Sequence, residues 1–168
     1  QNMALLYKTQ NIFFDYFLDH VIGKSLDHIF YTIDQMINSN NGYGKGIKKD
    51  VVFHALKEEQ SAHGFSVVNN VLICNAKVKG LSARKTMFFR LSSPIRLGDG
   101  RLVEMVACTI SPARLGVLNL RYLSRLTRLF GDSDVVVSLR AADTLDGLKL
   151  VLNGTPPMGV SSSGDMVA

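Results

Sequence analysis

The sequence predicts a single α/β domain, an α/β/α layered fold in which helices cover both faces of a mixed, partly parallel and partly antiparallel, central sheet. Segments with apolar residues at helical spacing alternate along the chain with segments rich in β-branched and aromatic residues. The predicted strand at 102–110 is apolar almost throughout, which indicates burial on both faces. The pair Asn69-Asn70 between two predicted strands indicates a hairpin, which excludes an all-parallel sheet.

Two helices are predicted before the strands. Ser25 is a suitable N-cap for the first, because apolar residues recur at helical spacing over 26–37. Asn and Gly residues over 38–46 interrupt this pattern. Asp50 is a suitable N-cap for a second helix, which we expect to end near Gln60.

The middle and the C-terminal third of the chain predict the remaining elements. Strands are expected at 65–68, 71–78, 85–91 and 102–110, with a loop at 94–100. Residues 118–130 form the clearest predicted helix, and 135–139 read as a short buried strand. A last helix is expected to begin after Asp143 or Thr144 and to end near Leu152.

This pattern divides the chain into three parts. Residues 1–12 are expected to be an N-terminal extension, in which Gln1-Asn2 before Met3 look like residues added in cloning. Residues 13–154 are expected to form the α/β domain. Residues 155–168 are rich in Gly, Ser and Pro and are expected to be a tail.

Composition narrows the classes of function. The chain has 168 residues and a net charge of +5, but its charges are spread and it has no Trp, so we expect no nucleic-acid partner. No apolar run approaches the length of a transmembrane helix, and the first residues lack the pattern of a signal peptide. Cys74 and Cys108 lie in apolar runs, as buried thiols do in a reducing compartment. No Cys/His spacing fits a metal site, and no cofactor is expected.

Four short segments suggest a family. Residues 56–60 read L-K-E-E-Q, residues 71–76 read V-L-I-C-N-A, residues 99–103 read D-G-R-L-V, and residues 119–123 read N-L-R-Y-L. In this order they resemble the E-R-E helix end, the V-A-I-P-H-A strand, the D-G-x-x-V turn and the H-L-x-x-L helix of bacterial phosphotransferase system IIA domains. The resemblance covers about 13–152 and is to the mannitol, fructose and nitrogen-regulatory (PtsN-like) type, whose fold it implies.

The departures from this family fall on its functional positions. The resemblance places Asn75 at the histidine that carries the phosphoryl group and Asn119 at the second active-site histidine. Glu59 stands where the family has an arginine that steadies the phosphate, and Cys74 replaces the proline before the acceptor. A carboxamide cannot accept the phosphoryl group, because its nitrogen lone pair is delocalised into the carbonyl, and a carboxylate repels phosphate. The sequence therefore predicts a degenerate site with no catalytic residue.

Two candidates for reactivity remain open. His63 lies in the predicted loop before the site, and it is either a relocated phospho-acceptor or a solvated histidine. Cys74 is either a reactive thiol beside the pocket or a small buried residue. Together, Cys74, Asn75 and Asn119 are the candidates for ligand binding. We expect Glu59 and the two asparagines to favour a polar neutral or cationic ligand.

A row of arginines is the candidate for partner binding. Arg121, Arg125 and Arg128 are spaced i, i+4, i+7 on the predicted long helix and share one face. They either form salt bridges within the domain or dock an acidic partner or a membrane surface. The resemblance implies a protein partner (a transporter, a kinase or a phosphocarrier) in a bacterial cytoplasm, and a homodimer is compatible with it.

The function predicted from the sequence is therefore a non-phosphorylatable, IIA-like regulatory or interaction domain. Two alternatives stay open. One is an active phosphotransferase component with His63 as its acceptor. The other is the cytoplasmic regulatory domain of a membrane transporter, which no transmembrane segment of this chain would anchor.

Overall fold

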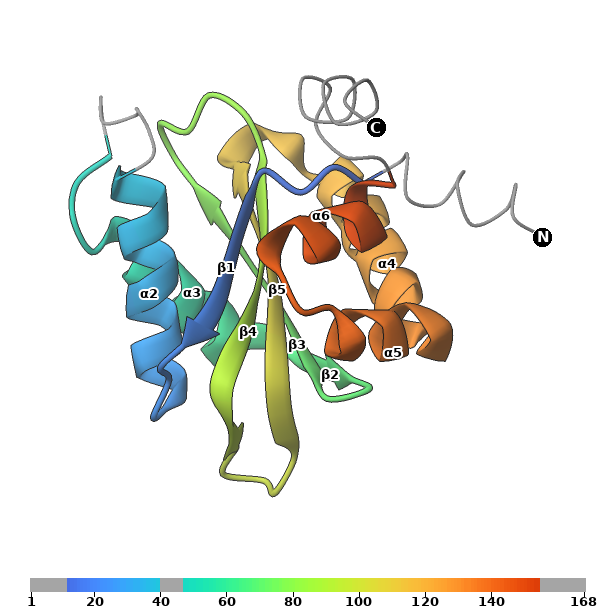
Figure 1. Ribbon diagram of the computed structural model, residues 1–168. Coiled ribbons are helices and arrows are strands. Elements are labelled where there is room, and N and C mark those ends of the chain that lie inside the picture. The colour runs from blue at the N-terminus through green and yellow to red at the C-terminus, as the bar shows by residue number, and fades with distance from the viewer. Residues whose placement is uncertain (1–11, 40–46, 155–168) are drawn as a thin grey trace.

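The structure, a computed structural model, describes residues 12–39 and 47–154. A five-stranded sheet stands between two groups of helices (Figure 1). The predicted N-terminal extension (except Ile12), most of the predicted break at 38–46 and the predicted tail at 155–168 lie outside the described residues. No helix within 12–39 or 47–154 is long and apolar enough to cross a membrane.

The sheet is mixed, as predicted. Its strands are β1 (Tyr16–Val21), β2 (Ser66–Val68), β3 (Val71–Val78), β4 (Lys85–Arg96) and β5 (Leu102–Pro112), in the order β1-β4-β5-β3-β2. The pairs β1/β4 and β3/β5 are parallel, whereas β2/β3 and β4/β5 are antiparallel. The two central apolar strands are buried on both faces, which is why their sequences lack a simple alternation.

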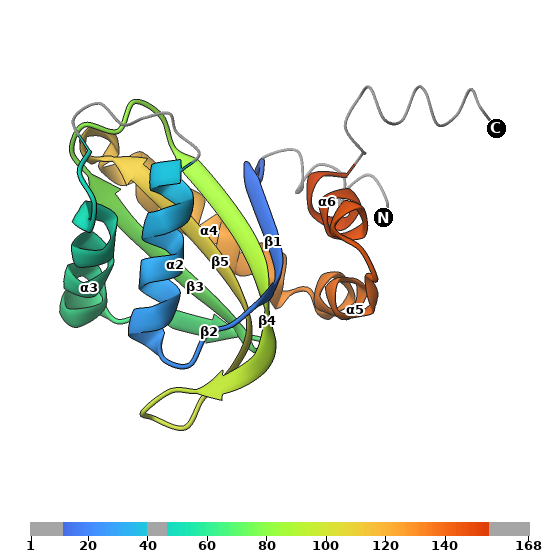
Figure 2. The same ribbon diagram turned by 60° about the vertical axis from the view of Figure 1, so that its left-hand side comes forward.

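Helices cover both faces of this sheet, which confirms the layered fold (Figure 2). One face carries α2 (Leu26–Ser39) and α3 (Val51–His63). The other carries α4 (Val117–Gly131), α5 (Ser133–Ala141) and α6 (Leu145–Asn153), and a short 3-10 helix, Ala113–Leu115, leads from β5 into α4. Successive residues of β3 enter opposite cores, since Leu72 packs with α2 and α3 while Ile73 packs on the α4 side.

Helix α4 is fixed to the sheet by aromatic packing at its C-terminal end. The rings of Phe88 and Phe130 are stacked with centroids 5.8 Å apart, and Phe14 meets both edge-on. The side chain of Asn69 donates to the carbonyl of Phe130 at 2.8 Å and satisfies a C-terminal group of the helix. This packing holds the N-terminal end of α4 over the end of β3.

Helix capping agrees with the sequence at two positions and differs at a third. The hydroxyls of Ser25 and Thr144 accept from backbone N–H groups of α2 and α6, as predicted. Asp50 precedes α3 but makes no side-chain cap. The buried Asp34 of α2 accepts from the N–H of Phe53 at 3.0 Å instead, so a tertiary contact replaces the local cap.

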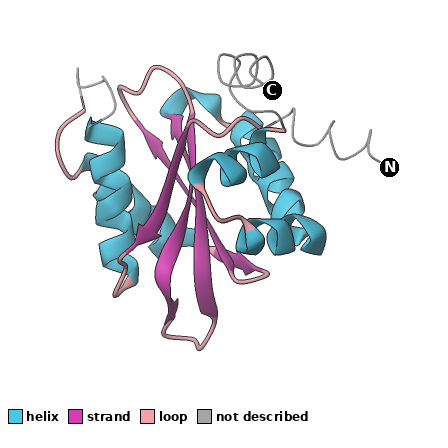
Figure 3. Ribbon diagram, in the orientation of Figure 1, coloured by secondary structure: helices cyan, strands magenta, loops and turns pink. Residues whose placement is uncertain are grey.

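The strand predicted at 135–139 is wrong, because this segment belongs to helix α5 (Figure 3). Its valines favour a strand by propensity, but Val135, Val136 and Leu139 are buried at helical spacing. Asp132 accepts from the N–H of Asp134 at 3.0 Å and caps the helix. Tertiary burial of one side therefore overrides the local preference.

Two strands also differ from the prediction, one that was missed and one that is longer than expected. Strand β1 was not predicted, because its sequence Y-F-L-D-H-V mixes polar and apolar residues without alternation. Strand β4 continues through Pro94, where a loop was expected. Its register against β5 shifts between Arg90 and Ile95, and a bulge of this kind tolerates proline.

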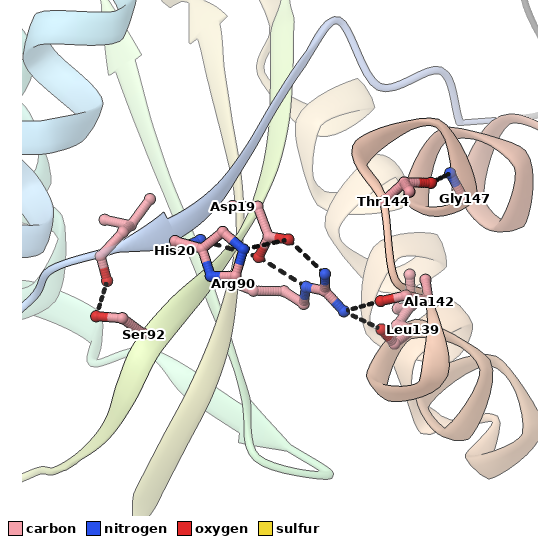
Figure 4. A network of polar contacts seen from close by, with 9 residues as sticks. Asp19, His20, Arg90, Ser92, Leu139, Ala142, Thr144 and Gly147 are labelled. Carbon is pink, nitrogen blue, oxygen red and sulfur yellow. Dashed lines mark hydrogen bonds and ion pairs between the residues drawn. The ribbon is translucent and has the colours of Figure 1, made fainter.

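Arg90 joins the sheet to the α5–α6 turn (Figure 4). Its guanidinium donates to both carboxylate oxygens of Asp19 and to the carbonyls of Leu139 and Ala142, at 2.9 and 2.7 Å for the carbonyls. The hydrogen bond from Arg90 holds the pKa of the Asp19 carboxyl below its usual value. Charge and donors are both satisfied here, so this network fastens α5 and α6 to β1 and β4.

Candidate functional site

Polar side chains cross the α4 side of the sheet in register. Asn75 of β3 lies beside Thr109 of β5, and Thr109 lies beside Thr86 of β4. Residues two apart on a strand share a face, so Lys77 of β3 follows Asn75 on this side and lies beside Ser111. These polar groups lie near the C-terminal ends of the parallel strands β3 and β5, next to the start of α4.

A pocket of about 620 Å³ opens at this place. It lies between the end of α3, strands β2 and β3, and the first turns of α4. Its polar lining includes three of the positions that the resemblance assigned to the degenerate site, Glu59, Asn75 and Asn119, together with the candidate His63 and with Lys77. Its apolar walls come from Phe65, Ile73, Val117, Leu120 and Leu123.

The carbonyl oxygen of Asn119 is bound by two residues that do not line the pocket. Its Oδ1 accepts from Arg84 Nη1 at 2.9 Å and from Ser111 Oγ at 2.8 Å. A guanidinium can only donate, so the atom that faces Arg84 must be the oxygen. The Nδ2 group has no partner within the described part of the chain, although the residue is only 3% exposed.

The Asn75 side chain is also enclosed, and its amide group also lacks a hydrogen-bond partner among the described residues. The residue is 9% exposed, and its side chain makes no hydrogen bond to any described residue. No fully buried side-chain nitrogen or oxygen of the described residues lacks a partner. The amide groups of Asn75 and Asn119 therefore reach the pocket surface, where they can bind a ligand.

Arg84 supports this site from behind Asn119. It lies in the β3–β4 connection, bonds to Ser111 as well as Asn119, and stacks its guanidinium 3.8 Å from the centre of the Tyr122 ring. Burial lowers the pKa of Arg84 from its usual value, and the neighbouring Arg125 lowers it further. It has no carboxylate partner among the described residues and keeps an unneutralised positive charge beside the pocket.

His63 lies at the mouth of the pocket rather than in a loop, since it is the last residue of α3. Its Nδ1 is 2.9 Å from Oε2 of Glu59, one turn earlier on the helix. This contact fixes the ring orientation and leaves Nε2 for other contacts. The carboxylate at position 59 is thus engaged by a neighbour.

The start of α4 offers backbone donors beside these side chains. Gly116 precedes the helix with φ 52°, a left-handed value that favours glycine, and provides no side-chain cap. Helices leave their first N–H groups without internal partners and carry partial positive charge at that end. Gly116 and Val117 both line the pocket, so this helix end is near any bound ligand.

The outer face of α4 is basic and partly apolar. Arg121, Arg125 and Arg128 form no ion pair with any residue in the described ranges, so the salt-bridge alternative from the sequence is not observed. Val117 and Leu120 are exposed on the same helix next to the pocket. The face combines unneutralised charge with exposed apolar surface.

Cys74 does not join the pocket, which corrects its assignment as a binding residue. Its side chain is fully buried on the α2–α3 face of the sheet, in register with Cys108 of β5. Burial, with a hydrogen bond to Cys74, raises the pKa of the Cys108 thiol well above its usual value. Both cysteine side chains are thus packed in the core between the sheet and helices α2 and α3.

Lys77, Arg84 and Ser111 are the site residues that the sequence analysis missed. Lys77 could have been found from strand periodicity, because it lies two residues beyond Asn75. Arg84 comes from a loop whose path the sequence does not specify. Within the described ranges, no group of three or more His, Cys, Asp or Glu side chains could hold a metal ion.

Comparisons with known proteins point to the family that the sequence resembles. No protein-family model matches the chain. A nitrogen regulatory protein of Bradyrhizobium diazoefficiens is 30% identical over 114 residues, which is 67% of this chain and 74% of that protein. The fold is similar to the nitrogen regulatory protein IIA-Ntr of Neisseria meningitidis, with TM-score 0.70 and 18% identity over 86% of this chain and 94% of that one. It is also similar to mannitol enzyme IIA of Escherichia coli, solved with phosphorylated enzyme IIB, with TM-score 0.63 and 12% identity over 82% of this chain and 94% of that one.

Proposed function

The chain belongs to the phosphotransferase system IIA family, of the nitrogen-regulatory type, and from this premise we propose that it is a regulatory, partner-binding domain that carries no phosphoryl group. One observation supports the proposal above the others. The enclosed polar groups of the pocket are the amides of Asn75 and Asn119, and an amide nitrogen is not a nucleophile at neutral pH.

The remaining polar groups support the same proposal. Phosphoryl transfer needs a nucleophile that faces the donor and cations around the transferred group. Cations are near the pocket, Lys77 in its lining and Arg84 bound to Asn119, but the enclosed side chains provide no nucleophile. The pocket is thus better suited to holding a group than to accepting one covalently.

We further propose that the partner is a protein that meets the outer face of α4 and the pocket mouth, in a bacterial cytoplasm. Mannitol enzyme IIA has been solved in complex with phosphorylated enzyme IIB, so a domain of this fold can bind a protein. Here the exposed Val117 and Leu120 supply apolar contact area, and Arg121 and Arg128 supply charge. A transporter, a kinase or a phosphocarrier protein would each fit such a surface.

Phosphorylation tests the proposal directly. The purified domain is incubated with phosphoenolpyruvate, the first enzyme of the system and its histidine phosphocarrier, and its intact mass is measured. We expect no added phosphoryl group, while a known IIA domain in the same tube gains one. An acid-labile gain of one phosphoryl group on this chain would overturn the proposal.

A relocated acceptor is the second candidate, favoured by the contact of Glu59 with His63. A carboxylate that contacts Nδ1 orients the imidazole and leaves Nε2 free to attack a phosphoryl donor. His63→Ala separates the two candidates in the same mass measurement. A phosphoryl gain that this substitution abolishes would establish His63 as the acceptor.

A further inference from the structure

We propose that the pocket binds an oxyanion, without a covalent bond, through the side-chain amides of Asn119 and Asn75, the ammonium group of Lys77 and the N-terminus of α4. This inference rests on the proposed absence of a covalent acceptor and assigns the pocket a ligand. It replaces the neutral or cationic ligand expected from the sequence, because the structure adds positive groups that the sequence analysis did not place there.

The orientation of Asn119 is the first step. Arg84 and Ser111 occupy its carbonyl oxygen at 2.9 and 2.8 Å, so the amide cannot rotate without facing N–H groups toward the donors of Arg84. The Nδ2 group is left without a partner in a side chain that is almost wholly enclosed. An enclosed, unpartnered donor that is fixed in place favours a ligand that accepts hydrogen bonds.

Asn75 and the start of α4 extend this set of donors. Asn75 lines the same pocket and has no side-chain partner among the described residues, so its Nδ2 can turn toward the same ligand. Gly116 leaves the helix without a side-chain cap, and its N-terminal N–H groups point outward along the axis. Donors from two elements thus converge beside one opening, as anion sites at helix N-termini require.

The charge balance favours an anion over a cation. Lys77 lines the pocket, and Arg84 lies directly behind Asn119 with no carboxylate partner in the described structure. Glu59 is the acidic side chain of the lining, and it is in contact with His63. Because two cations oppose one engaged carboxylate, we expect a doubly charged oxyanion such as a phosphate monoester to bind more tightly than a carboxylate.

Titration with inorganic phosphate tests the inference. The full chain is labelled with ¹⁵N, and the backbone and asparagine side-chain amide signals are followed by NMR as phosphate is added at constant ionic strength. We expect saturable shifts of the Asn75 and Asn119 side-chain signals and of the Val117 backbone signal. Acetate is expected to bind more weakly, and neutral acetamide is expected to leave these signals in place.

Three variants make the test specific. Asn119→Asp keeps the side-chain shape and can still accept the hydrogen bonds from Arg84 and Ser111. It removes the Nδ2 donor and adds a negative charge, so phosphate affinity should fall roughly tenfold or more. Lys77→Ala should weaken binding several-fold. Lys79→Ala is the matched control, because it removes the same charge two residues further along and does not line the pocket. Its affinity should stay close to that of the wild type.

Arg84 enters as a positioning residue. Arg84→Gln should weaken phosphate binding and change the exchange behaviour of the Asn119 side-chain signals, because the amide loses the donor that fixes its orientation. Arg84→Lys, which keeps a cationic donor, should recover most of the affinity. Loss in both variants without any change in the Asn119 signals would contradict the positioning role.

Several results would overturn the oxyanion site. They are the absence of saturable shifts with phosphate, equal weakening by Lys77→Ala and Lys79→Ala, or tighter binding of acetamide than of phosphate.

When phosphate does bind, titration with glycerol phosphate and with a phosphoserine peptide distinguishes a small molecule from a protein side chain as the source of the oxyanion. Inorganic phosphate cannot phosphorylate the chain, so failure here leaves the proposed function standing, and an acid-labile mass gain would defeat that function without bearing on this titration.

Discussion

Two arginines on neighbouring segments of this fold show opposite relations to their surroundings. Arg90 of β4 binds both oxygens of Asp19 and two backbone carbonyls, so its charge is neutralised and its donors are used. Arg84, which precedes the same strand, bonds only to the neutral acceptors Ser111 and Asn119 through one nitrogen.

The pKa values of the two side chains move in opposite directions. The hydrogen bond to Asp19 raises the pKa of Arg90, whereas burial and the nearby Arg125 lower the pKa of Arg84. The ion pair with Asp19 stabilises the charged form of Arg90, whereas Arg84 keeps an unpaired charge that a ligand or partner can use. The difference separates a polar network whose charges are paired from one that leaves a charge unpaired.

The largest expected effect is the loss of the structural network. Arg90→Ala leaves the carboxylate of Asp19, only 12% exposed, without its cation, and it frees two carbonyls at the α5–α6 turn. We expect the free energy of unfolding to fall by roughly 3 kcal/mol, as when one partner of a largely buried pair is removed. Urea unfolding followed by circular dichroism measures the change.

An exposed pair of the same fold provides the control for that measurement. Lys57 and Asp27 join α3 to α2 at 2.9 Å with both side chains about half exposed. Lys57→Ala should lower the free energy of unfolding by less than about 1 kcal/mol. A similar loss in both variants would mean that burial does not distinguish the Arg90 network.

The pH dependence of the same network is the second prediction. The pKa of Asp19 is lowered in the folded state, so its ion pair contributes stability above the unfolded carboxyl pKa of about 4 and loses it as the pH falls through the folded value. At pH 7, Asp19→Asn should be less stable than the wild type by about 2 kcal/mol. The difference should shrink below about pH 4. Unfolding curves between pH 7 and pH 3 check this, and a constant difference would contradict it.

The layered fold was predictable because burial and chain periodicity agree over most of its elements. β3, β5 and α4 carry enough apolar residues at regular spacing to identify them without tertiary information. The prediction for 135–139 was wrong because its valines favour a strand, whereas the cap at Asp132 and burial of one side stabilise a helix. β1 was missed because its stability comes from pairing with β4 and not from its own pattern.

The pocket was predictable only in part. Asn75, Asn119, Glu59 and His63 lie around one opening, where the resemblance placed the degenerate site; their functional roles remain predictions. Arg84 could not be placed, because a loop residue reaches Asn119 across 35 positions through the path of the β3–β4 connection. The sign of the pocket charge depends on that contact, so the ligand class predicted from the sequence differed from the one that the geometry favours.

Removal of the unpaired arginine sharpens the comparison at a smaller scale. Arg84→Ala removes two hydrogen bonds and the contact with Tyr122, but Ser111 still binds Asn119 and no carboxylate loses a cation. We expect the free energy of unfolding to fall by about 1 kcal/mol. Urea unfolding of Arg84→Ala and Arg90→Ala under the same conditions compares the two losses of unfolding free energy. An equal loss would show that Arg84 contributes to stability as much as Arg90 does.

The smallest expected effect has the opposite sign. Arg125 lies one turn from Arg121, close to Arg128 on the same face, and near enough to Arg84 to lower its pKa. Like charges at this helical spacing repel by roughly 0.2–0.5 kcal/mol, so Arg125→Gln should raise the free energy of unfolding by a few tenths of a kcal/mol at low salt. The gain in stability should vanish near 1 M salt, where the Debye length is only about 3 Å and the repulsion between the arginines is screened. Thermal unfolding at both salt concentrations tests this, with Arg96→Gln on the β4–β5 hairpin as the control. Destabilisation by Arg125→Gln at low salt would show that this arginine has a stabilising contact, and the contrast between paired and unpaired arginines would then end at Arg84.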